Sequence, residues 1–210
     1  MYKITGISGF VGQNLKERLG DSGTPDIVFH LACDGDSRGS NENIVCHTQN
    51  NLDIFIEVLD RAIKEGLKRF IYVSSAGVTW EKTVYAIEKL ACEEILKLMA
   101  SIHGFEYVII RPHNLFGEHM NLKDKNRNVI ANFIRERLAG NNVSIIGDPH
   151  ATRQFTYIGQ LIDVLEESIT KNTNQTVTVT SGIETSIEDL DYMITNLIKT
   201  IKWASSVTTE

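Results

Sequence analysis

Tyr85 and Lys89 stand four residues apart in the segment "VYAIEK", residues 84–89, and form the first pair in the chain that could do chemistry. Positions i and i+4 share one face of a helix, so both side chains can point to the same place. An ammonium beside a phenol favours the phenolate and draws the phenol pKa down from about 10, which suits an acid/base at neutral pH. A chain with six tyrosines can produce such a pair by chance, so other motifs must support it.

The glycine-rich segment "TGISGFVG" is the second candidate, and it lies between a strand-like and a helix-like stretch. Gly6, Gly9 and Gly12 follow one another at intervals of three residues. Such glycines permit a tight turn, close approach of the backbone to a diphosphate, and close packing of the helix on the strand. The segment therefore predicts a dinucleotide site at the start of the helix, with contacts from the three glycines and from Phe10 and Val11.

The elements that must position these residues follow an alternating pattern. Short apolar runs bounded by turn residues alternate with segments of helical period, which predicts βαβ units around a parallel sheet. From this pattern we expect strands at about 2–5, 26–32, 69–75, 106–110, 143–147 and 176–180. We expect helices at about 10–19, 42–65, 83–103, 127–139, 158–171 and 186–202. The fold class is thus α/β, a doubly wound parallel sheet in one compact unit, with a loose polar tail at 204–210.

Bulk properties exclude several classes of protein. The 210 residues, 42% of them hydrophobic, are enough for one substantial core. The net charge of -6 comes from scattered acids without a basic cluster, so we expect neither nucleic acid nor a membrane surface as a partner. Cys33, Cys46 and Cys92 lack paired spacing, which indicates reduced thiols, a cytoplasmic protein and no metal site. The chain opens into a strand-like stretch, and no apolar run approaches the roughly 20 residues of a membrane span, so export is not expected.

The glycine spacing and five further motifs together resemble the extended short-chain dehydrogenase/reductase superfamily. The spacing G-x-x-G-x-x-G after Thr5 is the first, and "IVFHLA" (27–32) is similar to the fourth strand of that branch. "GLKRFIYVSSA" (66–76) is similar to the fifth strand with its catalytic serine, and "YAIEK" to the Y-x-x-x-K. "RPHNLFGEHM" (111–120) and "IIGDPHATRQFTYI" (145–158) resemble the substrate-side motifs of NAD-dependent sugar-nucleotide epimerases and dehydratases. The resemblance implies a Rossmann-like fold and answers the question of chance in favour of chemistry.

The resemblance implies a catalytic role for three residues. Tyr85 would be the acid/base, Ser75 would hydrogen-bond the same sugar oxygen, and Lys89 would hold the nicotinamide ribose. The implied cofactor is NAD, with NADP left open. The expected cofactor contacts beyond the glycine segment are Leu31, Ala32, Asn51, Tyr85 and Lys89.

The resemblance also implies substrate contacts, on a nucleotide sugar. Asn114 corresponds to the asparagine of the R-P-x-N segment, Asn128 and Val129 to the start of the helix over the nucleotide, and Arg153 to a diphosphate-binding arginine. Arginine suits that role because its planar fork can meet two phosphate oxygens. Each of these residues could instead be a capping or surface residue.

The residues after Ser75 help to choose among reactions. Family members that eliminate water carry an Asp-Glu pair there, but this chain has Ala76 and Gly77, which disfavours a 4,6-dehydratase. A C4 epimerase that works by transient hydride transfer through a 4-keto sugar fits best. The alternatives are an NADPH-dependent 4-keto sugar-nucleotide reductase and a non-catalytic nucleotide-binding or assembly module.

The chain departs from the family where the second and third strands belong. Only "GDSGTPD" (20–26) separates the first helix from "IVFHLA", so the carboxylate that reads the adenosine ribose is missing, and Asp21 could replace it. The interval from Ser75 to Tyr85 is shortened as well. The shorter sheet edge would need a cover, which a partner subunit could supply.

The resemblance implies a division of labour along the chain. Residues 1–111 and 158–180 would form the dinucleotide-binding core, and residues 112–157 and 181–203 a reduced substrate lobe. The helices at 42–65 and 83–103 correspond to those that form a four-helix bundle in family dimers, so we expect a homodimer through them.

Overall fold

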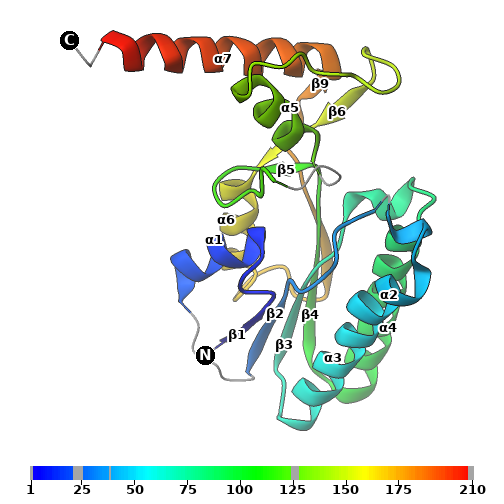
Figure 1. Ribbon diagram of the computed structural model, residues 1–210. Helices are drawn as coiled ribbons and strands as arrows, with labels where there is room; N and C mark the ends of the chain where they lie inside the picture. The colour runs from blue at the N-terminus through cyan, green and yellow to red at the C-terminus, as the bar shows by residue number, and fades with distance from the viewer. Residues whose placement is uncertain (1, 21–25, 38, 124–127, 208–210) are drawn as a thin grey trace.

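A central sheet of five parallel strands organises the protein (Figure 1). The computed structural model describes residues 2–20, 26–37, 39–123 and 128–207, with the backbone alone for 202–207. Across the sheet the strands stand in the order β1 (Tyr2–Thr5), β2 (Ile27–His30), β3 (Arg69–Val73), β4 (Glu106–Pro112) and β8 (Gln175–Val179). The expectation of an α/β fold on a parallel sheet is confirmed.

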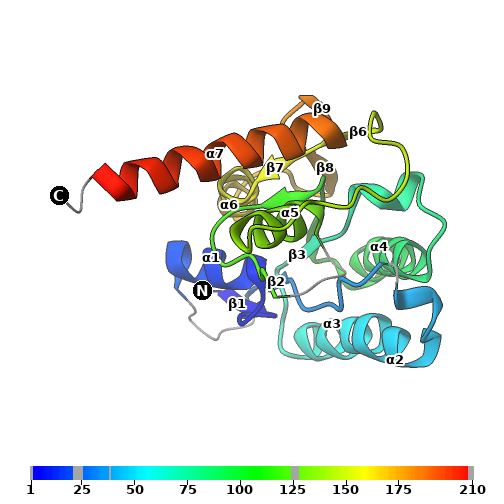
Figure 2. The ribbon, with the colours of Figure 1, turned by 45° about the horizontal axis from the view of Figure 1, so that its top comes forward.

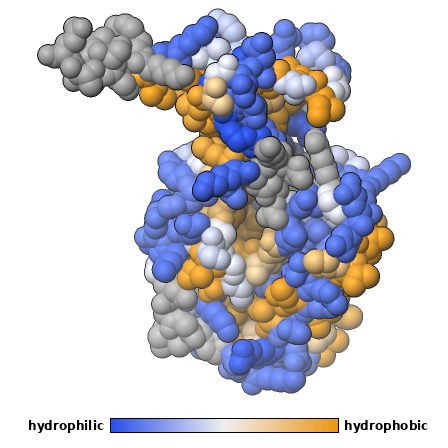
Figure 3. Space-filling view, in the orientation of Figure 1, coloured by the Kyte–Doolittle hydropathy of each residue, from blue (hydrophilic) through white to orange (hydrophobic). Residues whose placement is uncertain are grey.

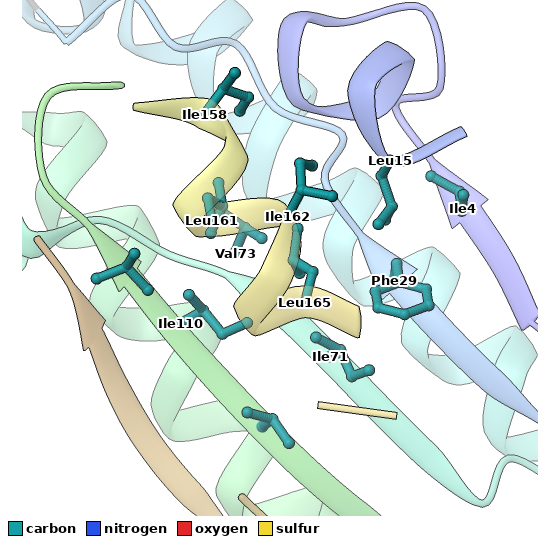
Figure 4. Close-up of a cluster of buried hydrophobic side chains, with 12 residues drawn as sticks. Ile4, Leu15, Phe29, Ile71, Val73, Ile110, Ile158, Leu161, Ile162 and Leu165 are labelled. Carbon is teal, nitrogen blue, oxygen red and sulfur yellow. The ribbon is translucent and has the colours of Figure 1, made fainter. Parts of the chain in front are cut away.

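One face of the sheet is covered by α1 (Phe10–Leu19) and α6 (Ile158–Glu167). Alternate strand residues point to this face, among them Phe29, Ile71 and Ile110, and they pack against Leu15 of α1 and Leu165 of α6 (Figure 4). Because helices cover both faces of the sheet, all five residues of β3 are buried, and four of them are apolar or aromatic.

The opposite face is covered by α3 (Ile54–Lys64) and α4 (Val84–His103). Phe70 and Tyr72 of β3 point to this face and pack against Phe55 of α3 and Leu96 of α4. The sheet thus separates two apolar clusters, and each cluster has its own pair of helices.

The helices that follow β1 and β2 lie on opposite faces, although both connections lead one strand further across the sheet in the same direction. Two such crossovers must have opposite hands. The connections through α3 and α4 share a face and therefore a hand, which by the strong rule for parallel strands is right-handed. The crossover from β1 through α1 to β2 is therefore left-handed.

The helix expected at 42–65 is interrupted. A short 3-10 turn at Gly39–Asn41 leads into α2 (Ile44–Thr48), then a π-helical turn covers Gln49–Asp53, and α3 begins at Ile54. A π turn inserts one extra residue and rotates the side chains around it, and such turns are frequent at functional sites. Here the turn carries the buried Asn51.

A small lobe sits above the carboxyl ends of the strands (Figures 1 and 2). It contains α5 (Val129–Leu138), α7 (Ile187–Val207), the antiparallel pair β6 (Thr152–Gln154) and β9 (Glu184–Ser186), and the parallel pair β5 (Leu115–Phe116) and β7 (Thr156–Tyr157). Its core joins Ile130 and Phe133 of α5 to Leu190 and Ile194 of α7.

Two expectations for this lobe are wrong. The apolar run 143–147 forms no strand, because Val143 and Ile145 pack on the core of the lobe while Ile146 is 89% exposed and no neighbouring strand pairs with it. The last helix does not end at 202 but continues to Val207, through most of the expected loose tail. Residues 208–210 lie outside the described residues.

Candidate functional site

The candidate residues gather where the parallel strands end. Gly6 follows β1, Ala32 follows β2 and Ser75 follows β3, so all three lie at the carboxyl edge of the sheet, where such sheets bind ligands. The loop after β1 turns toward α1 on one face, and the loop after β2 turns toward α2 and α3 on the other. In this type of fold, a dinucleotide lies across the strand ends where neighbouring loops diverge in this way, so we expect its crevice at the ends of β1 and β2.

Two of the three glycines in the loop are required by close packing. Gly6 has φ +70°, and a Cβ there would lie 2.6 Å from the backbone nitrogen of Ala32. A Cβ on Gly12 would collide with the carbonyl oxygen of Gly6. The loop is therefore pressed against the end of β2, and α1 against the loop, which brings Gly6, Gly9, Phe10, Val11 and Gly12 together beside Leu31 and Ala32.

The third glycine leaves the start of α1 open. Gly9 is the N-cap residue and no side chain caps the helix there, while its own N–H donates to the Gly6 carbonyl at 2.9 Å. The first N–H groups of an uncapped helix, with the positive end of its dipole, suit an anion. This end of the crevice fits a diphosphate.

Thr5 and His30 support the floor of the crevice, and sequence reasoning missed both. Thr5 Oγ1 accepts hydrogen bonds from the backbone of Leu31 at 3.2 Å and of Ala32 at 3.4 Å, and lies 3.1 Å from His30 Nδ1. Burial lowers the pKa of His30 to about 3, with a smaller contribution from the charge of Lys89, so this imidazole is neutral at physiological pH. Thr5 and His30 are polar residues at the ends of the otherwise apolar strands β1 and β2, a pattern that could have revealed both.

Lys89 is buried beneath the tyrosine, with a side chain only 3% exposed. Its Nζ donates to the Val73 carbonyl at 2.9 Å and lies 4.9 Å from the ring centroid of Tyr72 and 5.7 Å from that of Tyr85. The ammonium is therefore held between β3 and α4 by one carbonyl and two aromatic faces, a geometry that stabilises a buried cation.

The pKa of Tyr85 moves in the direction opposite to the expected one. Burial raises this pKa well above 10, and the neighbouring Cys33, Glu81 and Asp34 act in the same direction. The Lys89 ammonium, which is directed to the Val73 carbonyl, does not outweigh the burial of the phenol. Tyr85 is a protonated hydrogen-bond donor at neutral pH in this state of the protein.

Ser75 is the second residue after β3. Its Oγ accepts the Gly77 N–H at 3.1 Å and caps the 3-10 turn Ala76–Thr79, which packs on α4, the helix of Tyr85 and Lys89. The preceding serine has a different role, because Ser74 Oγ donates to Glu93 Oε1 at 2.6 Å in the interior. The structure thus brings Ser75, Tyr85 and Lys89 to the same edge of the sheet.

Both the oxygen and the nitrogen of the Asn51 side-chain amide are hydrogen-bonded to protein groups. Its Oδ1 accepts the Asp34 N–H at 2.6 Å, and its Nδ2 donates to the Asp34 carbonyl at 3.3 Å and to Glu88 Oε2 at 3.0 Å. Glu88 also binds Thr48 Oγ1 and His47 Nδ1, each at 2.8 Å. This network ties the loop after β2 to α4, so Asn51 positions the edge of the crevice. Its direct contact with a cofactor stays a prediction.

The expected substrate residues lie apart from this network. Asn114 is exposed and donates to the Gln154 carbonyl at 2.9 Å. Asn128 caps α5, because its Oδ1 accepts the Ile130 N–H at 2.8 Å. Val129 is the first residue of α5, and Arg153 is exposed on β6 without an ion pair to any residue that the structure describes. Of the two roles open to Asn128, substrate contact or helix cap, the structure shows the helix cap.

A sequence model of the NAD dependent epimerase/dehydratase family matches residues 18–179. The chain belongs to this family of enzymes. The putative UDP-glucose 4-epimerase of Methanocaldococcus jannaschii is 29% identical over 180 residues, which cover 79% of this chain and 58% of that protein. The GDP-mannose 3,5-epimerase 1 of Oryza sativa subsp. indica is 30% identical over 162 residues, 66% of this chain and 42% of that protein. The chain spans about half the length of the curated relatives it matches.

Solved structures share the fold. A UDP-N-acetylglucosamine 4-epimerase from Methanobrevibacter ruminantium, in complex with UDP-N-acetylmuramic acid, superposes with a TM-score of 0.88 at 23% identity, over 94% of this chain and 82% of that chain. The UDP-glucose 4-epimerase of Thermus thermophilus, in complex with NAD, gives a TM-score of 0.81 at 18% identity over 93% of this chain and 82% of that chain. The Rossmann-like architecture is therefore shared.

Membrane-spanning helices and metal-binding clusters are both absent from the described residues. In residues 2–20, 26–37, 39–123 and 128–207, no helix is long and apolar enough to cross a membrane. Within the same ranges, no cluster of three or more His, Cys, Asp or Glu side chains could hold a metal ion.

Proposed function

We propose that this chain is an NAD-dependent sugar-nucleotide epimerase that inverts C4 of the sugar. The observation that carries the proposal is the placement of Ser75, Tyr85 and Lys89 at the carboxyl edge of the sheet, beside a glycine loop with an uncapped helix start. Among the relatives named as epimerases, the putative UDP-glucose 4-epimerase supports the choice of C4.

NAD, when bound, would supply a hydride acceptor for C4. The residues of the chain would do the rest of the work. Ser75 would hold the C4 oxygen. Tyr85, once deprotonated, would take up the proton of that oxygen, become a phenol, and return the proton to the oxygen at the end of the cycle. Lys89, below the ring, would stabilise the phenolate while it lasts.

Substitution of the tyrosine tests the proposal. Wild-type protein with NAD should interconvert UDP-glucose and UDP-galactose, or another C4 pair from a panel of UDP-, GDP- and dTDP-sugars. Tyr85→Phe should lower the turnover by about 10²- to 10⁴-fold, the range for loss of a general acid/base. Tyr192→Phe, which removes an exposed hydroxyl on α7, is the matched control and should have no effect.

Other outcomes would point elsewhere. Net consumption of NADPH with a 4-keto sugar would favour the reductase. Wild-type protein that turns over no sugar nucleotide with either cofactor would contradict the proposal and favour a non-catalytic module.

A homodimer through α2, α3 and α4 forms part of the same proposal. Apolar side chains stand exposed along these helices, and Figure 3 shows apolar surface on this side of the body; they are Ile44, Val45, Ile56, Ile87, Leu90, Leu98 and Ile102. An apolar stripe of this length is typical of a surface that a partner covers. Light scattering should give the mass of a dimer for the wild type and of a monomer for Leu98→Glu. Three free cysteines agree with a reducing compartment such as the cytoplasm.

A further inference from the structure

The crevice between β1 and β2 lies at the edge of the sheet. Among the described residues, no strand pairs with the outer side of β1, and the sheet continues only toward β2. A dinucleotide that crosses such a crevice places one nucleoside on each side of it, and the strand beyond β1 carries the adenosine contacts. In this chain the described strands lie on one side of the crevice, from β2 inward, and no described strand lies on the adenosine side.

The supported side is the side of the chemistry. Ser75 follows β3, the second strand inward from the edge, and α4, which carries Tyr85 and Lys89, packs on the strands from β2 to β4. A nicotinamide ring must lie near these groups to exchange hydride with a substrate. The nicotinamide half of the cofactor therefore falls on the supported side, and the adenosine half falls beyond β1.

The outer strand is also uncovered on one face. Lys3, at the middle of β1, lines an open pocket of about 250 Å³ together with Val28 and the α3 residues Glu57, Arg61 and Glu65. Buried parallel strands normally have helices on both faces. Here the α3 side of β1 meets solvent. The apolar residues Val28, Val58 and Ala62 also line the pocket, but it lies along the second half of α3, which leads back to the amino edge of the sheet and away from the glycine loop.

In this type of fold a carboxylate about 20 residues after the glycine loop binds the adenosine ribose. The described acidic residues near that spacing do not face the outer side of β1. Asp26 stands 20 residues after Gly6, but it precedes β2 at the amino edge of the sheet and pairs with Lys68 at 3.0 Å. Asp34 follows β2 on the inner side, where its backbone binds Asn51. Asp21, which the sequence offers as a substitute, lies outside the described residues.

We propose that the crevice is a half-site, which recognises the nicotinamide ribose phosphate portion of the cofactor and leaves the adenosine in solvent. This inference rests on the proposed function. The glycine loop and the start of α1 take the phosphates, and Ser75, Tyr85 and Lys89 border the nicotinamide nucleoside. A half-site binds a mononucleotide nearly as well as a dinucleotide, and it is indifferent to a phosphate on the adenosine ribose.

Titration calorimetry of the wild-type protein tests this with NADH, NADPH, reduced nicotinamide mononucleotide and AMP. The dissociation constants of NADH and NADPH should agree within about threefold, and that of the mononucleotide should be within about tenfold of them, a difference of about 1.4 kcal/mol at most. AMP should give no heat. A preference of about 30-fold or more for NADH over the mononucleotide or over NADPH would overturn the half-site.

Two variants sharpen the result. Lys3→Glu, on the outer strand, should change none of the affinities, whereas Tyr85→Phe should weaken NADH and the mononucleotide by the same factor. Loss of NADH affinity alone in Lys3→Glu would show that adenosine contacts the edge and would overturn the proposal. Binding of NADH without the mononucleotide contradicts the half-site alone, while no binding of any nicotinamide ligand contradicts the proposed function as well.

Discussion

The catalytic side of the candidate site and its substrate side are built in different ways. On the catalytic side, Lys89, Glu88 and Asn51 are each at most 5% exposed and are fixed by hydrogen bonds to neighbouring elements. On the substrate side, Asn114 and Arg153 are exposed. The first side is preorganised by the core of the protein, and the second needs a ligand to fix its side chains. Substitutions should therefore affect stability on the first side and ligand binding on the second.

The largest loss of stability is expected at Glu93, which is fully buried under the serine strand. Its carboxylate accepts hydrogen bonds from Ser74 and from Arg111 Nε at 2.9 Å and pairs with the guanidinium. Glu93→Ala leaves a mostly buried arginine unpaired and should lower the free energy of unfolding by about 3–5 kcal/mol in urea titrations. Glu94→Ala, at an exposed position, should cost less than about 0.5 kcal/mol. Equal effects of the two variants would contradict the comparison.

The next largest effect concerns pH and His30. The folded-state pKa of about 3 lies below the ordinary value of 6.5, so the unfolded chain takes up the proton first as the pH falls. The contribution is fully present above 6.5 and is lost as the pH drops toward 3; at about pH 5 the loss is about 2 kcal/mol. Denaturation at pH 7 and pH 5 should show this loss for the wild type, and a loss smaller by that amount for His30→Asn. Identical pH dependence in both would rule out His30 as the source.

A smaller effect is expected at the cap of α5. Asn128→Ala removes the hydrogen bonds to the first turn and should lower the free energy of unfolding by about 1 kcal/mol. Asn121→Ala, in the exposed loop before the helix, is the control and should be near neutral. A larger loss, comparable with that of Glu93→Ala, would place Asn128 with the preorganised side of the site.

The smallest effect on stability belongs to Arg153. Arg153→Ala should change the free energy of unfolding by less than about 0.5 kcal/mol. It should weaken the binding of a nucleotide sugar by about 1.5–3 kcal/mol, the range for a hydrogen bond to a charged group. Arg61→Ala, at an exposed position of α3, should leave that binding unchanged. Unchanged affinity in Arg153→Ala would remove this residue from the site.

Sequence reasoning predicted most of the sheet, because buried parallel strands such as 69–73 carry their signal in continuous apolar runs. It placed a strand at 143–147 because apolarity alone does not tell which runs find a pairing partner. The π turn at Gln49–Asp53 also leaves no signal in the hydrophobic periodicity. The buried position of Asn51 could therefore not be predicted from the sequence.

The placement of the candidate residues was predictable from their motifs, whereas their electrostatics was not. The motifs predicted that Ser75, Tyr85 and Lys89 lie at one edge of the sheet, because the carboxyl ends of parallel strands meet there. The direction of the Tyr85 pKa depends on burial and on where the Lys89 ammonium is directed, and neither is written in a spacing of four residues.

The left-handed crossover at β1 has a consequence for the order in which the chain folds. A strand, helix and parallel strand connected with that hand rarely form on their own, so residues 2–30 are a poor nucleus. The right-handed units from β2 to β4 can assemble first, after which β1 and α1 add to a finished edge. In native-state hydrogen exchange, the amides of β1 should therefore open at a lower free energy than those of β3, and the glycine loop should loosen with them.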